Sequence, residues 1–289
     1  MKADSATSSS PVRVLLLAVM LVISGVLVAC GGESADPGGG EAIEHVHGLG
    51  INPADGALFI ATHSGLFRSP DGSAVADRVG ESAQDTMGFT VVGADRFLGS
   101  GHPGPGEGGP ASLGLIESDN AGSSWRGISL AGEADFHVLR YAHQRIYAVN
   151  ALTGLLMVSS DEGKTWAERQ PPGPVIDLAV DPDDPERLIV STKRGLAISE
   201  DDGESWRPLL DEVGLITWTE GGRLYLVDAA GQVQSSDDVG QGWAELGSIG
   251  GQPGALVSAT DEELYAALVD GTVMASTDGG VSWKVRSSQ

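Results

Sequence analysis

The fold is decided by the stretch Ser159-Ser160-Asp161-Glu162-Gly163-Lys164-Thr165-Trp166, because its pattern S-x-D-x-G-x-T-W returns along the chain. Later copies are centred on Asp201, Asp238 and Asp278, and an earlier copy on Asn120. A worn first copy at Asp71 lacks the tryptophan. Self-similarity at a period of roughly 40 residues indicates a repeat architecture, in which each unit buries its apolar face against the next.

The motif has a structural explanation that needs no ligand. Ser and Asp side chains accept hydrogen bonds from backbone N–H groups of the turn, and Gly adopts backbone conformations that other residues resist. The tryptophan is predicted to be buried beside each turn. The residues given this structural role are Asp71, Asn120, Asp161, Asp201, Asp238 and Asp278. The tryptophans predicted to be buried are Trp125, Trp166, Trp206, Trp243 and Trp283.

Each unit also carries short apolar runs typical of strands, for example residues 175–180, 187–191 and 195–199 before the motif at Asp201. The motif resembles the Asp-box, or bacterial neuraminidase (BNR), repeat of sialidase-like β-propellers. The resemblance implies an all-β, six-bladed propeller over residues 43–289, with four strands in each blade. How the ring closes is not evident from the sequence.

The N-terminus has the pattern of an export signal. Lys2 and Arg13 precede an apolar run over residues 14–28, which ends in Leu27-Val28-Ala29-Cys30. This resembles a bacterial lipobox, which implies cleavage after residue 29 and lipidation of Cys30. Residues 30–42 would then be a Gly-rich tether. The expected location is the cell envelope, lipid-anchored to the membrane and facing outside the cytoplasm. An uncleaved transmembrane anchor is the alternative.

Composition restricts the partners. The formal net charge is −23, and removing residues 1–29 leaves about −24. Such a surface repels phosphate backbones, so nucleic acid is not an expected partner. With Cys30 as the single cysteine, no intrachain disulfide can form.

Repeat register predicts that most histidines gather on one face. In this propeller type the first strand of each blade lies innermost, and its start shares a face, the top face, with the loop between the second and third strands. His47 and His137 fall at strand starts, His63 and His102 follow second strands, and Met87 matches His47 in the second blade. His45 adjoins the strand start at His47, and His143 falls on the opposite face.

Imidazoles from separate strands, with a thioether, suggest a metal site for one copper or zinc ion. The predicted ligands are His47, His63, His102, His137 and Met87. His45 could join His47 only if the strand start is irregular. Alternatively, these histidines form hydrogen bonds with turn backbones or hold the long loop in place. The Gly- and Pro-rich insertion 101–114 is expected to be a lid or pocket wall, or else an inert loop.

The motifs HVHGLG (45–50), THSGL (62–66) and SGHPGPG (100–106) resemble bacterial lipoproteins filed as glycosylhydrolase-like or exo-sialidase-like. A fold does not fix a function. A sialidase needs clustered arginines for the substrate carboxylate, yet only Arg194 and Arg140 are placed to reach the top face. Its tyrosine nucleophile is not evident either, because Tyr147, Tyr225 and Tyr265 occupy equivalent core positions. Tyr141 remains in a first strand, without an obvious partner.

Two hypotheses remain. The first is a noncatalytic binding module for a metal, a protein or a carbohydrate on the top face. The second is a glycosyl hydrolase with a nonstandard site that uses Asp135, Glu133 or His137.

Overall fold

The computed structural model describes residue 43 and residues 45–288. The predictions for residues 1–42, including the signal peptide, Cys30 and the tether, lie outside the described residues.

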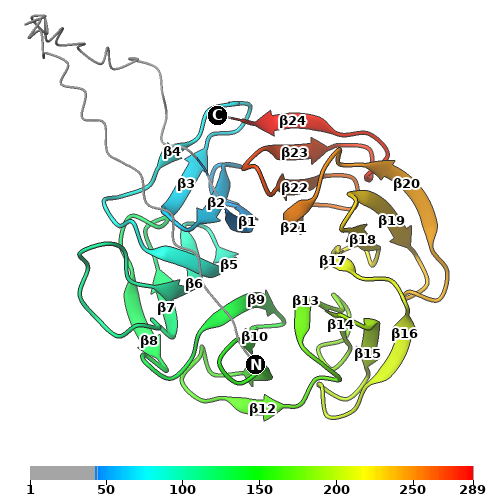
Figure 1. Ribbon diagram of the computed structural model, residues 1–289, viewed down its shortest axis with the longest axis horizontal. Coiled ribbons are helices and arrows are strands. Elements are labelled where there is room, and N and C mark those ends of the chain that lie inside the picture. The colour runs from blue at the N-terminus through cyan, green and yellow to red at the C-terminus, as the bar shows by residue number, and fades with distance from the viewer. Residues whose placement is uncertain (1–42, 44, 289) are drawn as a thin grey trace, which may run out of the picture. The chain divides into compact units, whose positions relative to one another are not determined.

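Six four-stranded antiparallel sheets follow one another in chain order, one per repeat, and they are arranged in a ring around a central axis (Figure 1). Blade 1 consists of β1 (Val46–Ile51), β2 (Leu58–Thr62), β3 (Gly65–Ser69) and β4 (Asp77–Arg78). Blade 2 consists of β5 (Asp85–Gly93), β6 (Arg96–His102), β7 (Leu115–Ser118) and β8 (Arg126–Ser129). Blade 3 consists of β9 (Phe136–Ala142), β10 (Arg145–Asn150), β11 (Leu155–Ser159) and β12 (Ala167–Arg169). Blade 4 consists of β13 (Val175–Val180), β14 (Leu188–Thr192), β15 (Gly195–Ser199) and β16 (Arg207–Leu210). Blade 5 consists of β17 (Gly214–Trp218), β18 (Leu224–Asp228), β19 (Gln232–Ser236) and β20 (Ala244–Ser248). Blade 6 consists of β21 (Pro253–Ser258), β22 (Leu264–Leu268), β23 (Val273–Ser276) and β24 (Lys284–Ser287).

The prediction of an all-β, six-bladed propeller is therefore confirmed. Within the described part of the chain, no helix is long and apolar enough to cross a membrane.

The hydrophobic core lies between the blades, because side chains alternate along each strand. On β2, Leu58 and Ile60 pack in a cluster shared with blade 6, whereas Phe59 and Ala61 pack in a cluster shared with blade 2. Every other pair of neighbouring blades has its own buried cluster. Each sheet thus needs a neighbour on both faces, which is the physical reason for a closed ring.

The Asp-box turns are held by a repeated set of hydrogen bonds. In blade 3, the Gly163 backbone N–H donates to Ser159 Oγ at 2.9 Å, and Ser159 Oγ donates to Asp161 Oδ1 at 2.9 Å. Glu162 and Gly163 both adopt left-handed backbone angles, with φ of 62° and 80°. Hydrogen bonds from the backbone and side chain of Thr165 lower the pKa of Asp161 to about 2. The carboxylate therefore stays ionised while it organises the turn.

The motif tryptophans, predicted to be buried, are half-buried at equivalent places in their blades. Each packs against the edge of the core between its own blade and the preceding one, as Trp206 does beside blade 3. The indole N–H of Trp206 donates to the Gly203 carbonyl at 3.1 Å, and Trp243 and Trp283 make the same bond. Because the indole spans from the core to a surface turn, one edge of it stays in contact with water.

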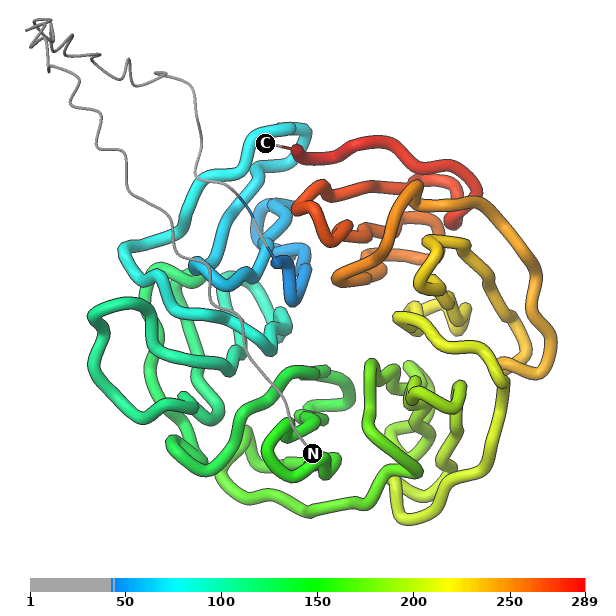
Figure 2. Tube along the Cα trace, viewed as in Figure 1, coloured from blue at the N-terminus to red at the C-terminus, as the bar shows by residue number. Residues whose placement is uncertain are grey.

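The ring closes through side chains, and each terminal sheet is built from one contiguous stretch. Figure 2 shows the red end of the chain beside the blue and cyan first blade. Arg286 on β24 donates to Ser69 Oγ at 2.9 Å and to the Pro70 carbonyl at 2.8 Å. Ser287 Oγ donates to the Ala74 carbonyl at 2.9 Å. In blade 1, Ser69 Oγ therefore accepts from Arg286 where the other blades use a glycine N–H.

Candidate functional site

The inner strands begin with a bulge that turns side chains toward the axis. Pairing of β1 with β2 steps from Val46 to Gly48, which leaves His47 unpaired. A β-bulge re-aims the extra residue and often lies beside a binding site. The same step leaves Met87, His137, Ile176 and Gly254 unpaired in blades 2, 3, 4 and 6.

These five residues line one cavity of about 240 Å³, which we call the axial pit. The three whose side chains can ligate a metal, His47, Met87 and His137, come from consecutive blades. The register argument expects these three residues at the starts of the inner strands, and in the structure they line the same pit. His63 and His102 lie farther out and do not line the pit.

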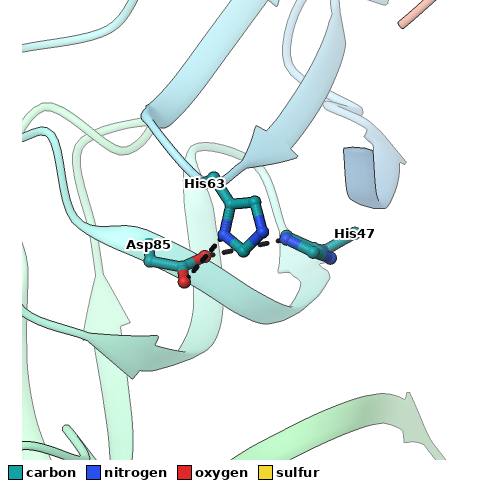
Figure 3. Close-up of side chains that lie close together, drawn as sticks. All are labelled: His47, His63 and Asp85. Carbon is teal, nitrogen blue, oxygen red and sulfur yellow. Dashed lines mark ion pairs between the residues drawn. The ribbon is translucent and has the colours of Figure 1, made fainter. Parts of the chain in front are cut away.

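Site I lies between blades 1 and 2 and consists of His47, His63 and Asp85. His63 Nδ1 is 2.8 Å from Asp85 Oδ2, and His47 Nε2 is 3.7 Å from Asp85 Oδ1. Figure 3 shows the His63 ring between the Asp85 carboxylate and the His47 ring. The two imidazole rings meet edge to face, with centroids 4.5 Å apart. Their ligating atoms lie within 4.8 Å of one another, as one bound ion would require.

Local structure fixes two of these positions. His63 sits on the tight turn between β2 and β3, where Thr62 Oγ1 accepts from the Ser64 N–H at 3.1 Å and donates to the Gly65 carbonyl at 2.9 Å. Asp85 begins β5 of the next blade. The site therefore joins a loop of one blade to the inner strand of its neighbour.

The polar atoms of site I are incompletely satisfied. Within the described residues, His47 Nε2 and Asp85 Oδ1 are buried and have no hydrogen-bond partner. Burial, followed by the nearby His63, lowers the pKa of His47 from 6.5 to about 4. His47 is thus a neutral base at physiological pH, which is the form that binds metals.

Site II lies between blades 2 and 3 and consists of His102, Asp135 and His137. His137 Nε2 is 2.9 Å from Asp135 Oδ2, and His102 Nε2 is 3.7 Å from the same oxygen. Asp135 is only 5% exposed, and its Oδ1 lacks a hydrogen-bond partner among the described residues. These three ligating atoms also lie within 4.8 Å of one another.

The insertion 101–114 positions His102, and none of its residues lines the axial pit. His102 Nδ1 lies 2.7 Å from the Ala111 carbonyl. Glu107 fastens the loop by accepting from the Gly104 N–H at 2.9 Å and Ser82 Oγ at 2.9 Å. Gly101 has a φ of 145°, and a Cβ there would lie 1.9 Å from the Asp85 carbonyl oxygen. Only glycine lets this strand pass so close to Asp85.

The remaining histidines belong to neither group of candidate ligands, although one of them contacts site I. His45 is exposed, has a φ of 53° and stacks edge to face with His63 at 5.0 Å between centroids. The start of β1 is therefore irregular, which is the condition under which His45 was expected to join His47. His143 Nε2 bonds to the Asp181 carbonyl at 2.8 Å, on a turn between a first and a second strand.

Four of the five predicted ligands thus form two clusters, and Met87 belongs to neither. Sequence reasoning did not name either carboxylate as a metal ligand, although it named Asp135 as a candidate residue of a hydrolase. The signal was present in the register. Asp85-Thr86-Met87 and Asp135-Phe136-His137 align with His45-Val46-His47, so Asp85 and Asp135 also stand two residues before a bulged residue.

The pit contains an ion pair that does not suit a sialidase. Arg140 is the one arginine lining the pit, and it donates to Asp177. Burial raises the pKa of Asp177, and the Arg140 charge opposes that rise. Asp177 also accepts from the Ile216 N–H at 2.9 Å and the Leu178 N–H at 2.8 Å. Arg140 is therefore already paired, and the described residues offer no arginine cluster in this cavity.

The repeat tyrosines occupy the core, as predicted from their register. Tyr147 and Tyr225 are fully buried, and their hydroxyls donate to the carbonyls of Pro185 at 2.9 Å and Asp261 at 2.6 Å. Tyr265 is 7% exposed and bonds to Glu263.

Comparisons with known proteins agree with this fold. A family model for the Sortilin-Vps10 domain, described as "Sortilin, neurotensin receptor 3", matches residues 114–241. No curated protein matches the chain. Site I lies outside the matched residues.

Three solved structures show the range of similar propellers. YCF48 bound to D1 peptide is 17% identical with a TM-score of 0.55, and the match covers 85% of this chain and 83% of that one. The nidogen/laminin complex gives 14% identity, a TM-score of 0.58 and coverage of 78% and 91%. An ancestral GH74 enzyme gives 13% identity and a TM-score of 0.56, with 81% of this chain matching only 36% of the enzyme. At these identities the likeness shows the fold alone.

Proposed function

We propose that this protein is a lipid-anchored, extracytoplasmic binding module whose top face holds a transition-metal ion at site I. One observation carries the proposal. His47 Nε2 is buried without a hydrogen-bond partner in the described structure, next to a second imidazole and a carboxylate. An unsatisfied buried polar atom costs about 1–3 kcal/mol, and a bound cation would remove that cost.

Zinc or copper suits the donor set. Two imidazoles and a carboxylate resemble zinc sites that keep a position open for water or a ligand. Copper also accepts imidazole, and the thioether of Met87 in the same pit would favour its reduced form. Because His47 lines the pit, an open position on the ion would face a ligand entering there.

The partner we propose is a protein or carbohydrate that docks on the top face. Neighbours of the same fold that bind a peptide or another protein support the first class. A formal net charge of about −24 after removal of residues 1–29 disfavours nucleic acid. Lipidation at Cys30 would hold the propeller at the membrane surface of the cell envelope, on a tether of residues 30–42.

A sialidase-like glycosyl hydrolase is the second candidate. The observation that favours it is the contact between Asp135 and His137 at 2.9 Å, a buried carboxylate beside an exposed imidazole at the mouth of the pit. Glu133 is exposed just before this pair. Turnover of a glycoside panel by metal-free protein, lost in Asp135→Asn, would favour this candidate over the binding module.

Zinc titration of chelator-treated mature protein tests the primary proposal. Replacing both His47 and His63 by Ala should remove one equivalent of bound zinc, whereas His143→Ala should bind as the wild type does. The proposal is wrong if the wild type takes up neither zinc nor copper, or if the His47/His63 variant retains every equivalent.

A further inference from the structure

Site II occupies the same place as site I, one blade further around the ring. Site I takes the bulged residue and the loop histidine of blade 1, His47 and His63, with Asp85 from the start of blade 2. Moving each position on by one blade gives Met87, His102 and Asp135. His137, the next bulged residue, completes the histidine pair of site II.

The repeat does not continue further. In blade 3 the position of His63 and His102 is taken by Ala151, which follows Asn150 as His63 follows Thr62. In blade 4 the bulged residue is Ile176. Two adjacent blade interfaces therefore carry metal-ligand chemistry, and the next interface does not.

Hydrogen bonding at His102 determines which of its nitrogens faces Asp135. The Ala111 carbonyl can only accept, so His102 Nδ1 must carry the proton of this bond at 2.7 Å. In neutral imidazole the other nitrogen, Nε2, then presents a lone pair. That lone pair lies 3.7 Å from Asp135 Oδ2, so two atoms able to ligate a cation face each other.

The Ala111 carbonyl is placed to orient His102 as a metal ligand. A histidine that ligates through one nitrogen commonly donates its other N–H to a backbone carbonyl, which fixes the ring. Ala111 belongs to the insertion 101–114, which the hydrogen bonds of Glu107 hold in place. The insertion thus aims His102 Nε2 at Asp135.

We propose that the chain binds a second transition-metal ion at the interface between blades 2 and 3, held by His102, Asp135 and His137. The protein then carries two ions, at sites I and II, in place of the single ion expected from its sequence. Because His47 and His137 both line the pit, both sites border the same cavity. This inference extends the proposed function, but the number of bound ions tests it separately.

Stoichiometry of the mature protein is the experiment. Chelator-treated protein is loaded with excess zinc, passed over a desalting column and analysed for metal per chain. The wild type and the matched control His143→Ala should hold two equivalents. The variants His47→Ala/His63→Ala and His102→Ala/His137→Ala should hold one each, and their combination none.

Cobalt substitution adds a readout that misfolding does not mimic. The d–d absorption of cobalt should rise until two equivalents are bound, and each double variant should lose one component of the spectrum. Asp135→Asn, which preserves side-chain shape, should weaken the site II component at least tenfold and leave site I unchanged.

A single equivalent in the wild type would overturn the second site while leaving the proposed function intact. Loss of all metal in both double variants would mean that one shared ion is bound. No bound metal at all would overturn both proposals.

Discussion

Acid should destabilise this propeller through His47, and replacing His47 by Gln isolates the effect. The pKa of His47 lies at about 4 in the folded protein, first because of burial, compared with 6.5 for a free side chain. Between these values the unfolded chain binds a proton at this position and the folded chain does not. Stability linked to His47 is therefore fully present above pH 6.5 and is lost as the pH falls toward 4.

The magnitude follows from the same two values. At about 1.4 kcal/mol per pKa unit, the gap from 6.5 to 4 corresponds to roughly 3 kcal/mol. The side chain is only 19% exposed, so solvent screens little of this energy. Relative to His47→Gln, the wild type should lose about this much unfolding free energy between pH 7.5 and pH 4.

Urea unfolding followed by tryptophan fluorescence measures the difference, with EDTA present to exclude metal binding at site I. His143→Gln is the matched control, since its ring bonds to a carbonyl away from both sites. If the wild type and His47→Gln lose stability in parallel over this pH range, burial of a neutral His47 is refuted.

Three further predictions concern other parts of the chain. Mass spectrometry of native protein should find a lipid-modified Cys30 at the mature N-terminus, and Cys30→Ser should release the protein or leave it unprocessed; residues 1–29 still attached to most native protein would contradict this. Trp206→Ala should cost about 3 kcal/mol in urea unfolding, the lower end for buried aromatics, because the ring is half-buried; a cost under about 1 kcal/mol would show that its packing in the core is unimportant. Arg286→Ala should lower the unfolding free energy by about 1–3 kcal/mol through loss of its bonds to blade 1. The exposed Arg207, replaced by Ala, should change it by less than about 0.5 kcal/mol. Equal effects of the two arginine variants would exclude a role for Arg286 in closing the ring.

The fold could be predicted because its determinants are local. The spacing of the boxes at Asp161, Asp201, Asp238 and Asp278 sets the period, and apolar alternation within each unit specifies the strands. Ring closure could not be predicted, because Arg286 meets Ser69 through a contact that joins opposite ends of the chain. The repeat pattern contains no information about such a contact.

The sequence predicted which strand positions carry most of the candidate ligands, but it did not predict how these ligands are grouped. Strand register places His47, Met87 and His137 at the axis, since their bulges recur at equivalent positions. Grouping into two sites depends on Asp85 and Asp135, which reach across to the preceding blade. Which histidines meet which carboxylate depends on how closely neighbouring blades pack. The spacing of the repeats along the sequence does not specify that packing.

Every sheet is built from one uninterrupted stretch of chain. The chain could therefore begin and end between any two neighbouring blades without changing a sheet. A circularly permuted chain that starts at β13 and finishes on blade 3 would keep all strand pairings and would require only a linker across the seam between β24 and blade 1. The contacts of Arg286 would then lie within the chain, and neither site I nor site II would be cut. Blades can in the same way be gained or lost as whole units during evolution, without rebuilding a sheet shared between the two termini.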